Sequence, residues 1–136
     1  MSVVMELIRV GANGAINFGN YELDSKSKVQ DFEHDGDLYK VKSFKEITKL
    51  KRNGMFVYES VPGTAVFDLI FIDGGLSFKV SGKDGAQITV ELEAETEYEI
   101  LVDDSNLGKM KTNLSGKLMF SLEFKEEMVD VKIVKI

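Results

Sequence analysis

Alternation of apolar and polar residues is the main regularity along this chain. Segments 87–93, 98–102 and 118–124 place apolar side chains at every second position, which is the period of a β-strand with one buried and one solvated face. Similar short segments recur at intervals of roughly 8–12 residues, separated by Gly, Asn, Asp and Ser. The pattern predicts an all-β fold: an antiparallel β-sandwich, or a sandwich-like barrel, of about ten to twelve short strands with little or no helix.

The segment 46–81 contains the three clearest turn signals. Asn53-Gly54 suits a two-residue type I′ hairpin, because both residues accept a positive φ. Val61-Pro62-Gly63 suits a type II turn, in which proline fixes φ at the first central position and glycine supplies a positive φ at the second. Asp73-Gly74-Gly75 predicts another tight reversal. Thr64–Ile72 is the most apolar run and is predicted to form a strand buried on both faces.

The region before Asn53-Gly54 admits two structures. Ile47 and Leu50 lie three positions apart, as on a helix, but only about seven residues are available and the turn that follows favours a hairpin strand. With 136 residues, 43% of them hydrophobic, the chain is long enough to bury a core. We predict one domain over 1–136. The alternative is two subdomains that meet at a boundary near 62–63.

Charge is distributed unevenly between the two halves of the chain. The formal net charge is −6 at pH 7, which argues against general binding to nucleic acids or anionic membranes. Residues 1–62 carry nine Lys/Arg and nine Asp/Glu, whereas residues 63–136 carry eight and fourteen. The whole acidic excess therefore lies in the second half.

A basic stretch lies inside the neutral half. Lysines interleaved with Tyr39 and Phe44 have some of the character of a nucleic-acid-binding β-face. Because the whole chain is acidic, we expect instead a dipolar surface whose opposite patches attract each other, with no nucleic acid and no membrane as partner. The stretch is opposed only by Glu46 and contains Lys40, Lys42, Lys45, Lys49, Lys51 and Arg52.

The absence of cysteine excludes a disulfide framework, thiol catalysis and thiolate metal sites. The first nine residues lack the basic start of a secretory signal. No apolar run approaches the roughly 20 residues needed to cross a bilayer. A soluble, cytoplasmic protein is therefore expected.

Five glutamates recur at every second position between residues 91 and 99, and Asp103 and Asp104 follow them. An extended backbone would place alternate carboxylates on one side, and clusters of carboxylate oxygens bind Ca²⁺. Asp103 and Asp104 are therefore candidates for a calcium site. The alternative is that the run forms the solvated face of edge strands, where charges discourage edge-to-edge pairing.

Few residues suggest catalysis. His34 is the single histidine, and its polar, acidic surroundings predict an exposed turn rather than a Ser-His-Asp site. A glycosidase could use two carboxylates of the run 91–104. However, the chain has 23 acidic residues, so a pair of carboxylates can be found in it whether or not it is a glycosidase. Tyr39, Tyr58 and Tyr98 are candidates for stacking on a sugar, with half-buried packing as the alternative. No catalytic residue and no cofactor is assigned.

Several turn motifs resemble those of a group of short bacterial proteins, some of which carry an automatic "endosialidase" label. The resemblance covers most of the chain and implies a small all-β protein without placing catalytic residues. Its motifs lie at residues 36–42, 53–54, 58–64 and 112–116.

The last forty or so residues are also similar to the C-terminal β-sandwich appendages of polysaccharide-degrading enzymes. The similar parts are residues 98–102, 112, 116–120 and the final alternating strand. Together these observations predict a non-enzymatic binding or accessory module for a glycan or a partner protein. The alternatives are a small glycan-active hydrolase with paired carboxylates, and a structural subunit that forms homo-oligomers through edge strands.

Overall fold

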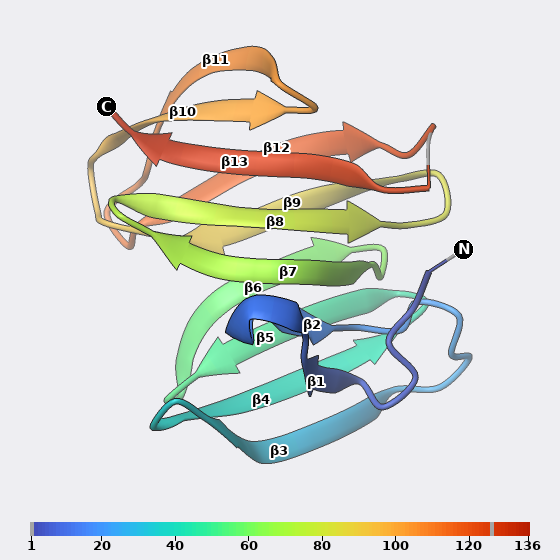
Figure 1. Cartoon of the computed structure of the whole chain (residues 1–136). Coiled ribbons are helices and arrows are strands. Elements are labelled where there is room, and N and C mark those ends of the chain that lie inside the picture. The colour runs from blue at the N-terminus through green and yellow to red at the C-terminus, as the bar shows by residue number, and fades with distance from the viewer. Residues whose placement is uncertain (1, 126) are drawn as a thin grey trace.

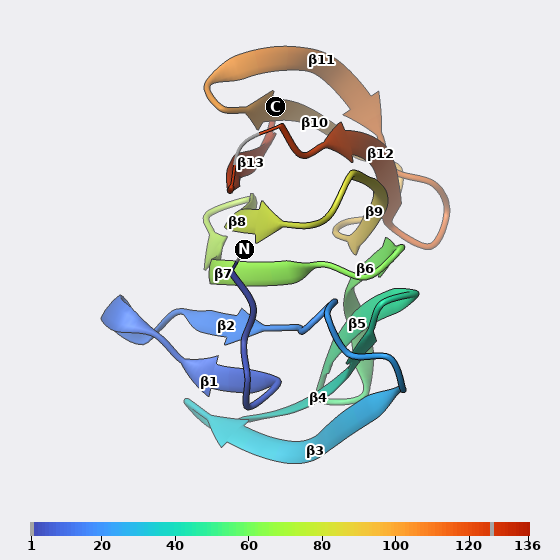
Figure 2. The same cartoon turned by 90° about the vertical axis from the view of Figure 1, so that its right-hand side faces the viewer.

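The structure is a computed structural model that describes residues 2–125 and 127–136. These residues form thirteen β-strands in two antiparallel sheets that pack face to face as a sandwich (Figures 1 and 2). The only helical segment among them is a 3₁₀ turn, η1 (Ala12–Gly14). The predicted antiparallel sandwich is confirmed, with slightly more strands than the alternation indicated.

One sheet has seven strands, and chain-distant strands are neighbours within it. The strand β13 lies in its interior, between β8 and β10, and the β10–β11 hairpin forms one edge. In spatial order the strands are β1 (Ile8–Val10), β2 (Ile16–Phe18), β7 (Ala65–Ile72), β8 (Gly75–Ser81), β13 (Val129–Lys135), β10 (Glu97–Val102) and β11 (Ser105–Lys111).

The other sheet has six strands and begins as a simple meander. Four consecutive strands are joined by hairpins, and two later strands extend the sheet on the far side. In spatial order they are β3 (Ser27–His34), β4 (Asp37–Phe44), β5 (Ile47–Arg52), β6 (Met55–Val61), β9 (Gly85–Glu91) and β12 (Lys117–Glu123). The links at 62–64 and at 92–96 are two of the places where the chain passes from this sheet to the other.

The core lies between the two sheets because most strands bury alternate side chains. In β12, for example, Leu118, Phe120 and Leu122 are buried, and the residues between them are exposed. Tyr58 is fully buried near the centre. Its ring makes edge-to-face contacts with Phe18 and Phe78 of the opposite sheet, with centroids 5.4 and 5.6 Å away, a favourable geometry for aromatic pairs.

Five buried hydroxyl side chains form a hydrogen-bonded network beside this core. The Thr48 Oγ1 lies 2.8 Å from the Ser43 Oγ, donates to the Thr64 carbonyl at 2.8 Å and accepts from the Thr64 N–H at 3.0 Å. The Thr64 Oγ1 in turn contacts the Tyr58 hydroxyl at 2.8 Å and the Ser60 hydroxyl at 2.7 Å. The network fastens β4, β5 and β6 to the residue that leads into β7 on the other sheet.

Two of the predicted reversals are confirmed. Asn53 and Gly54 have φ values of 52° and 78°, as a type I′ turn requires, and they join β5 to β6. Residues 45–51 therefore belong to a hairpin and not to a helix. Asp73 and Gly74 likewise join β7 to β8.

The prediction of a type II turn at Val61-Pro62-Gly63 is wrong. Gly63 does not have a positive φ, and the Val61–Pro62 peptide is cis. Glycine is required at 63 for space instead, because a Cβ there would lie 2.0 Å from the Phe44 carbonyl oxygen. The prediction for Thr64–Ile72 holds only for its first half: Ala65–Phe67 is buried, whereas Ile70 and Phe71 are 42% and 43% exposed.

The N-terminal region also departs from expectation. The first strand is short: Ile8–Val10 pairs with Ile16–Phe18. His34, expected in an exposed turn, is the last residue of β3 and is partly buried. Its Nε2 lies 2.8 Å from the Gly14 carbonyl oxygen, so the side chain contacts η1 at the start of the other sheet.

Candidate functional site

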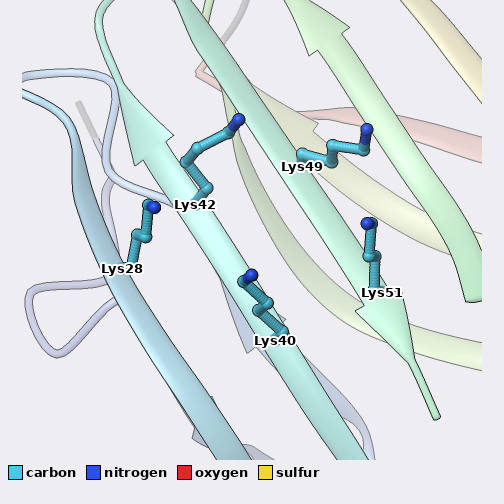
Figure 3. Close-up of a pocket in the computed structure, with 5 residues that line it drawn as sticks. All are labelled: Lys28, Lys40, Lys42, Lys49 and Lys51. Atoms are coloured by element: carbon cyan, nitrogen blue, oxygen red, sulfur yellow. The ribbon is translucent and has the colours of Figure 1, made fainter. Parts of the chain in front are cut away.

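Five lysines from three adjacent strands project from the outer side of the six-stranded sheet (Figure 3). We call this group the lysine face. A shallow hollow lies between its side chains. The residues are Lys28 of β3, Lys40 and Lys42 of β4, and Lys49 and Lys51 of β5.

Strand alternation and register bring these lysines together. In β4, Tyr39 and Val41 are buried, so Lys40 and Lys42 must point outward. The strand register then forms three pairs in which one lysine lies directly opposite another on the neighbouring strand. The pairs are 28 and 42, 42 and 49, and 40 and 51. Like charges in directly opposed positions destabilise a sheet.

Carboxylates do little to neutralise this charge. Glu59 of β6 lies 3.6 Å from the Lys49 ammonium. Within residues 2–125 and 127–136, the other four lysines have no carboxylate oxygen within 4.0 Å. Burial lowers the pKa of the Lys42 ammonium below its usual value, and repulsion from nearby lysines, above all Lys26 and Lys49, lowers this pKa further. The lysine face is thus a concentrated positive patch on an acidic protein.

Replacing Lys42 by glutamine is expected to stabilise the fold. Lys42 is the only member opposed by two other lysines, and removing one like-charge pair is worth roughly 0.2–1 kcal/mol. We therefore expect a gain of about 0.5–1 kcal/mol in the free energy of unfolding at low salt, measured by urea denaturation, and a smaller gain at high salt because screening weakens the repulsion. A loss of stability at low salt would contradict this account of the lysine face.

Aromatic rings beside the lysine face are already covered by cations. The Phe56 ring lies beneath the ammonium groups of Lys49 and Lys117, at 5.4 and 4.5 Å from its centroid. The Phe44 ring lies 6.0 Å from the Lys26 ammonium. Such cation–π contacts hold the ammonium groups in place. They also occupy the ring faces on which a nucleic-acid base would stack.

Sequence reasoning found only part of this group. It named Lys40, Lys42, Lys49 and Lys51, but it missed Lys28. Two other members of the predicted basic stretch point elsewhere: the Lys45 ammonium lies 3.8 Å from Asp24, and the Arg52 guanidinium stacks 3.9 Å from the Phe71 ring centroid.

The acidic run 91–104 is divided between the two sheets. Glu91 is on β9 and lies 2.9 Å from the Lys117 ammonium, whereas Glu97 and Glu99 are on β10 of the other sheet. The structure describes no group of three or more His, Cys, Asp or Glu side chains placed to hold a metal ion.

Asp103 and Asp104 form the turn between β10 and β11, with φ values of 49° and 65°. The Asp103 carboxylate accepts a hydrogen bond from the Asp130 N–H at 2.9 Å. Their positions are thus explained by hairpin geometry. The calcium site stays a prediction without a ligand set around it.

The three candidate tyrosines lie in the core. Tyr39, Tyr58 and Tyr98 are only 5%, 0% and 2% exposed. The Tyr98 hydroxyl accepts a hydrogen bond from the Glu93 N–H at 3.1 Å, and the Tyr58 hydroxyl belongs to the buried network. None of these rings offers a surface on which a sugar could stack.

Burial raises the pKa of Tyr58 well above its usual range, and hydrogen bonds with Thr64 and Ser60 offset this only in part. The unfolded chain therefore releases this proton first as the pH rises through about 10. The stability contributed by Tyr58 is complete below pH 10 and falls above it, by about 1.4 kcal/mol per pH unit. We expect Tyr58→Phe to remove this part of the alkaline slope in urea unfolding; an unchanged slope would contradict the assignment.

The fold and this patch define an all-β sandwich protein with a cationic sheet face. Comparison with protein-family models, with curated proteins and with solved structures found no match to the chain. Across the described residues, no helix is long and apolar enough to cross a membrane.

Proposed function

We propose that this protein is a non-enzymatic binding module that holds an acidic polysaccharide on its lysine face. The observation that carries the proposal is the register of β3, β4 and β5, which places lysines directly opposite one another three times. This arrangement costs stability in the free protein. A bound polyanion would supply the missing counter-charge and turn the repulsion into attraction.

The shape of the site favours a polymer over a small anion. The five ammonium groups are spread over three strands on the outside of a sheet (Figure 3). Lysine is a flexible, strongly hydrated point charge, suited to a series of separate anionic groups rather than to one planar group held in a fixed fork. A chain with regularly spaced carboxylates or sulfates can contact several of these lysines at once.

Two observations favour a polysaccharide over a nucleic acid. The rings of Phe44 and Phe56 are covered by lysines, so they are not free for the base stacking on which single-strand binding relies. The sequence resemblance to appendages of polysaccharide-degrading enzymes points in the same direction. The tyrosines are not needed in this proposal, because charge and not stacking selects the ligand.

The test is binding to polygalacturonate, a polymer of carboxylated sugars, measured over a range of salt concentrations. The variant Lys40→Gln/Lys42→Gln/Lys51→Gln removes three charges from the lysine face. Its matched control removes three exposed lysines elsewhere, with the changes Lys83→Gln, Lys109→Gln and Lys111→Gln. Both variants move the formal net charge from −6 to −6 − 3 = −9, so bulk charge is held equal between them.

We expect the first variant to bind polygalacturonate at least about tenfold more weakly at low salt. The slope of log affinity against log salt concentration, which is negative, should become shallower by about two to three. The control should keep the wild-type slope. Equal losses in the two variants would overturn the proposal. Tighter binding of single-stranded DNA than of polygalacturonate would overturn the choice of ligand.

A further inference from the structure

A second hollow opens at the end of the lysine face where Lys40 and Lys51 lie. It has a volume of about 220 Å³ and shares these two lysines with the first hollow. Its other lining residues differ in character, because they include an amide, a carboxylate and an aliphatic side chain. They are Gln30, Asp31, Leu38, Tyr39, Asn53 and Gly54.

Two β-bulges frame this hollow. Between β3 and β4 the register moves from the pair Val29–Val41 to the pair Phe32–Tyr39, so Gln30 and Asp31 together face Lys40. Asp31 has a φ of 56°, an uncommon value for a residue other than glycine. Such bulges redirect side chains and are frequent beside binding sites.

The second bulge lies on the other side of the lysine pair, between β5 and β6. There the register moves from Leu50–Tyr58 to Lys51–Phe56, which leaves Val57 unpaired. The directly opposed pair Lys40–Lys51 is thus flanked on both sides by a local change in strand twist.

The polar groups of this hollow do not neutralise one another. In the described part of the chain, no carboxylate oxygen lies within 4.0 Å of the Lys40 or Lys51 ammonium, although Asp31 lines the same hollow. Gln30 and Asp31 are exposed, and Leu38 is 46% exposed. Two lysines, three polar side chains, one aliphatic side chain and the edge of a mostly buried tyrosine therefore line one open hollow.

We infer that this hollow is a subsite for a single carboxylated sugar residue, at the end or on a branch of the polysaccharide. The inference rests on the proposed function. The Lys40 and Lys51 ammonium groups bind the carboxylate of the sugar. The Asp31 carboxylate and the Gln30 amide bind its hydroxyl groups, and Leu38 packs against the apolar face of the ring.

The experiment is an NMR titration of the labelled protein with D-galacturonate, with D-galactose and acetate as separate controls. D-Galactose has the ring without the carboxylate, and acetate has the carboxylate without the ring. We expect saturable amide shifts with D-galacturonate alone, centred on residues 30–31, 38–40 and 51. Similar shifts with acetate would show an anion site without sugar recognition and would overturn the subsite.

A pair of variants separates this subsite from the lysine face as a whole. Gln30→Ala/Leu38→Ala leaves every lysine in place and should weaken D-galacturonate binding about fivefold or more. The matched control Gln87→Ala/Met119→Ala changes an exposed glutamine and an exposed apolar residue on β9 and β12, and it should bind D-galacturonate as the wild type does. Equal binding by the two variants would overturn the subsite.

The polymer distinguishes failure of the subsite from failure of the proposed function. If wild-type protein binds polygalacturonate in a salt-dependent way but gives no shifts with D-galacturonate, the subsite is wrong and the lysine face stands. If it binds neither, the proposed function is wrong and the subsite fails with it.

Discussion

Replacing Thr48 by valine is expected to lower the free energy of unfolding by about 4 kcal/mol. The Thr48 hydroxyl serves both the N–H and the carbonyl of Thr64, and both residues are fully buried. Valine has nearly the same shape but leaves these two backbone groups without a partner, and each orphaned group costs about 1–3 kcal/mol. The loss is a large share of the 5–15 kcal/mol by which a domain is stable.

Urea unfolding of Thr48→Val measures this loss, and two further variants show whether the network causes it. Thr48→Ser keeps the hydroxyl and removes one methyl group, so we expect a cost nearer 1 kcal/mol. Tyr58→Phe removes one hydrogen bond while the Thr64 Oγ1 keeps its contact with Ser60, which again predicts about 1 kcal/mol. If Thr48→Ser proved as costly as Thr48→Val, the hydroxyl would not be the important group.

Gly63→Ala is expected to cost about 3 kcal/mol or more. The added Cβ would lie 2.0 Å from the Phe44 carbonyl oxygen, and backbone cannot move aside as cheaply as a flexible side chain. A hydrogen bond also holds Gly63 against this segment, because the Gly63 N–H donates to the carbonyl of the next residue, Lys45, at 3.0 Å. Either the link into β7 or the end of β4 must therefore shift.

Gly36→Ala is the matched control for this variant. Gly36 lies in the β3–β4 turn with a φ of 82°, and a Cβ there would meet nothing within 4 Å. Only the left-handed backbone conformation is strained, at about 1–2 kcal/mol. Thermal or urea unfolding should rank Gly63→Ala well below Gly36→Ala in stability. Equal losses would show that backbone conformation, and not close approach, requires Gly63.

Much of the sandwich could be predicted because its signals are local. Asn53-Gly54 specifies its own turn geometry, and the alternation in 118–124 specifies which side chains enter the core. Gly63 shows the limit of such reasoning. The tripeptide Val61-Pro62-Gly63 fits a type II turn by its composition, but its glycine is required by contact with Phe44, a residue 19 positions earlier, and no local pattern reports that contact.

The lysine face could be predicted only in part, because its register depends on a bulge. Pairing outward from the Asp35-Gly36 turn matches His34 with Asp37. Continuing this register would place Lys28 opposite Ser43, which is buried. The bulge at Gln30–Asp31 shifts the pairing by one residue, so Lys28 faces Lys42 instead. A one-residue shift exchanges the two faces of a strand, and the sequence has no clear signal for this one.

For the lysine face the sequence analysis missed a member of a real cluster, whereas for the acidic run it predicted a cluster whose members lie apart. The regular spacing of the glutamates over residues 91–99 suggests that their carboxylates share one surface. The chain, however, leaves the six-stranded sheet after Glu91 and enters the other sheet at Glu97. The link at 92–96, which carries the chain from one sheet to the other, scatters the row. The tyrosines were also ambiguous, because a tyrosine in an alternating strand can face either the core or the solvent.

The position of β13 has a consequence for how the chain folds during synthesis. The strands that carry the lysine face are joined by short hairpins, so they can pair soon after they leave the ribosome. In the seven-stranded sheet, β8 and β10 are linked only through β13, which is made after both. Until residues 129–135 emerge, β8 has an open edge and the β10–β11 hairpin has no sheet to join. A nascent chain stalled after Glu123 is therefore expected to expose edges that pair with other chains.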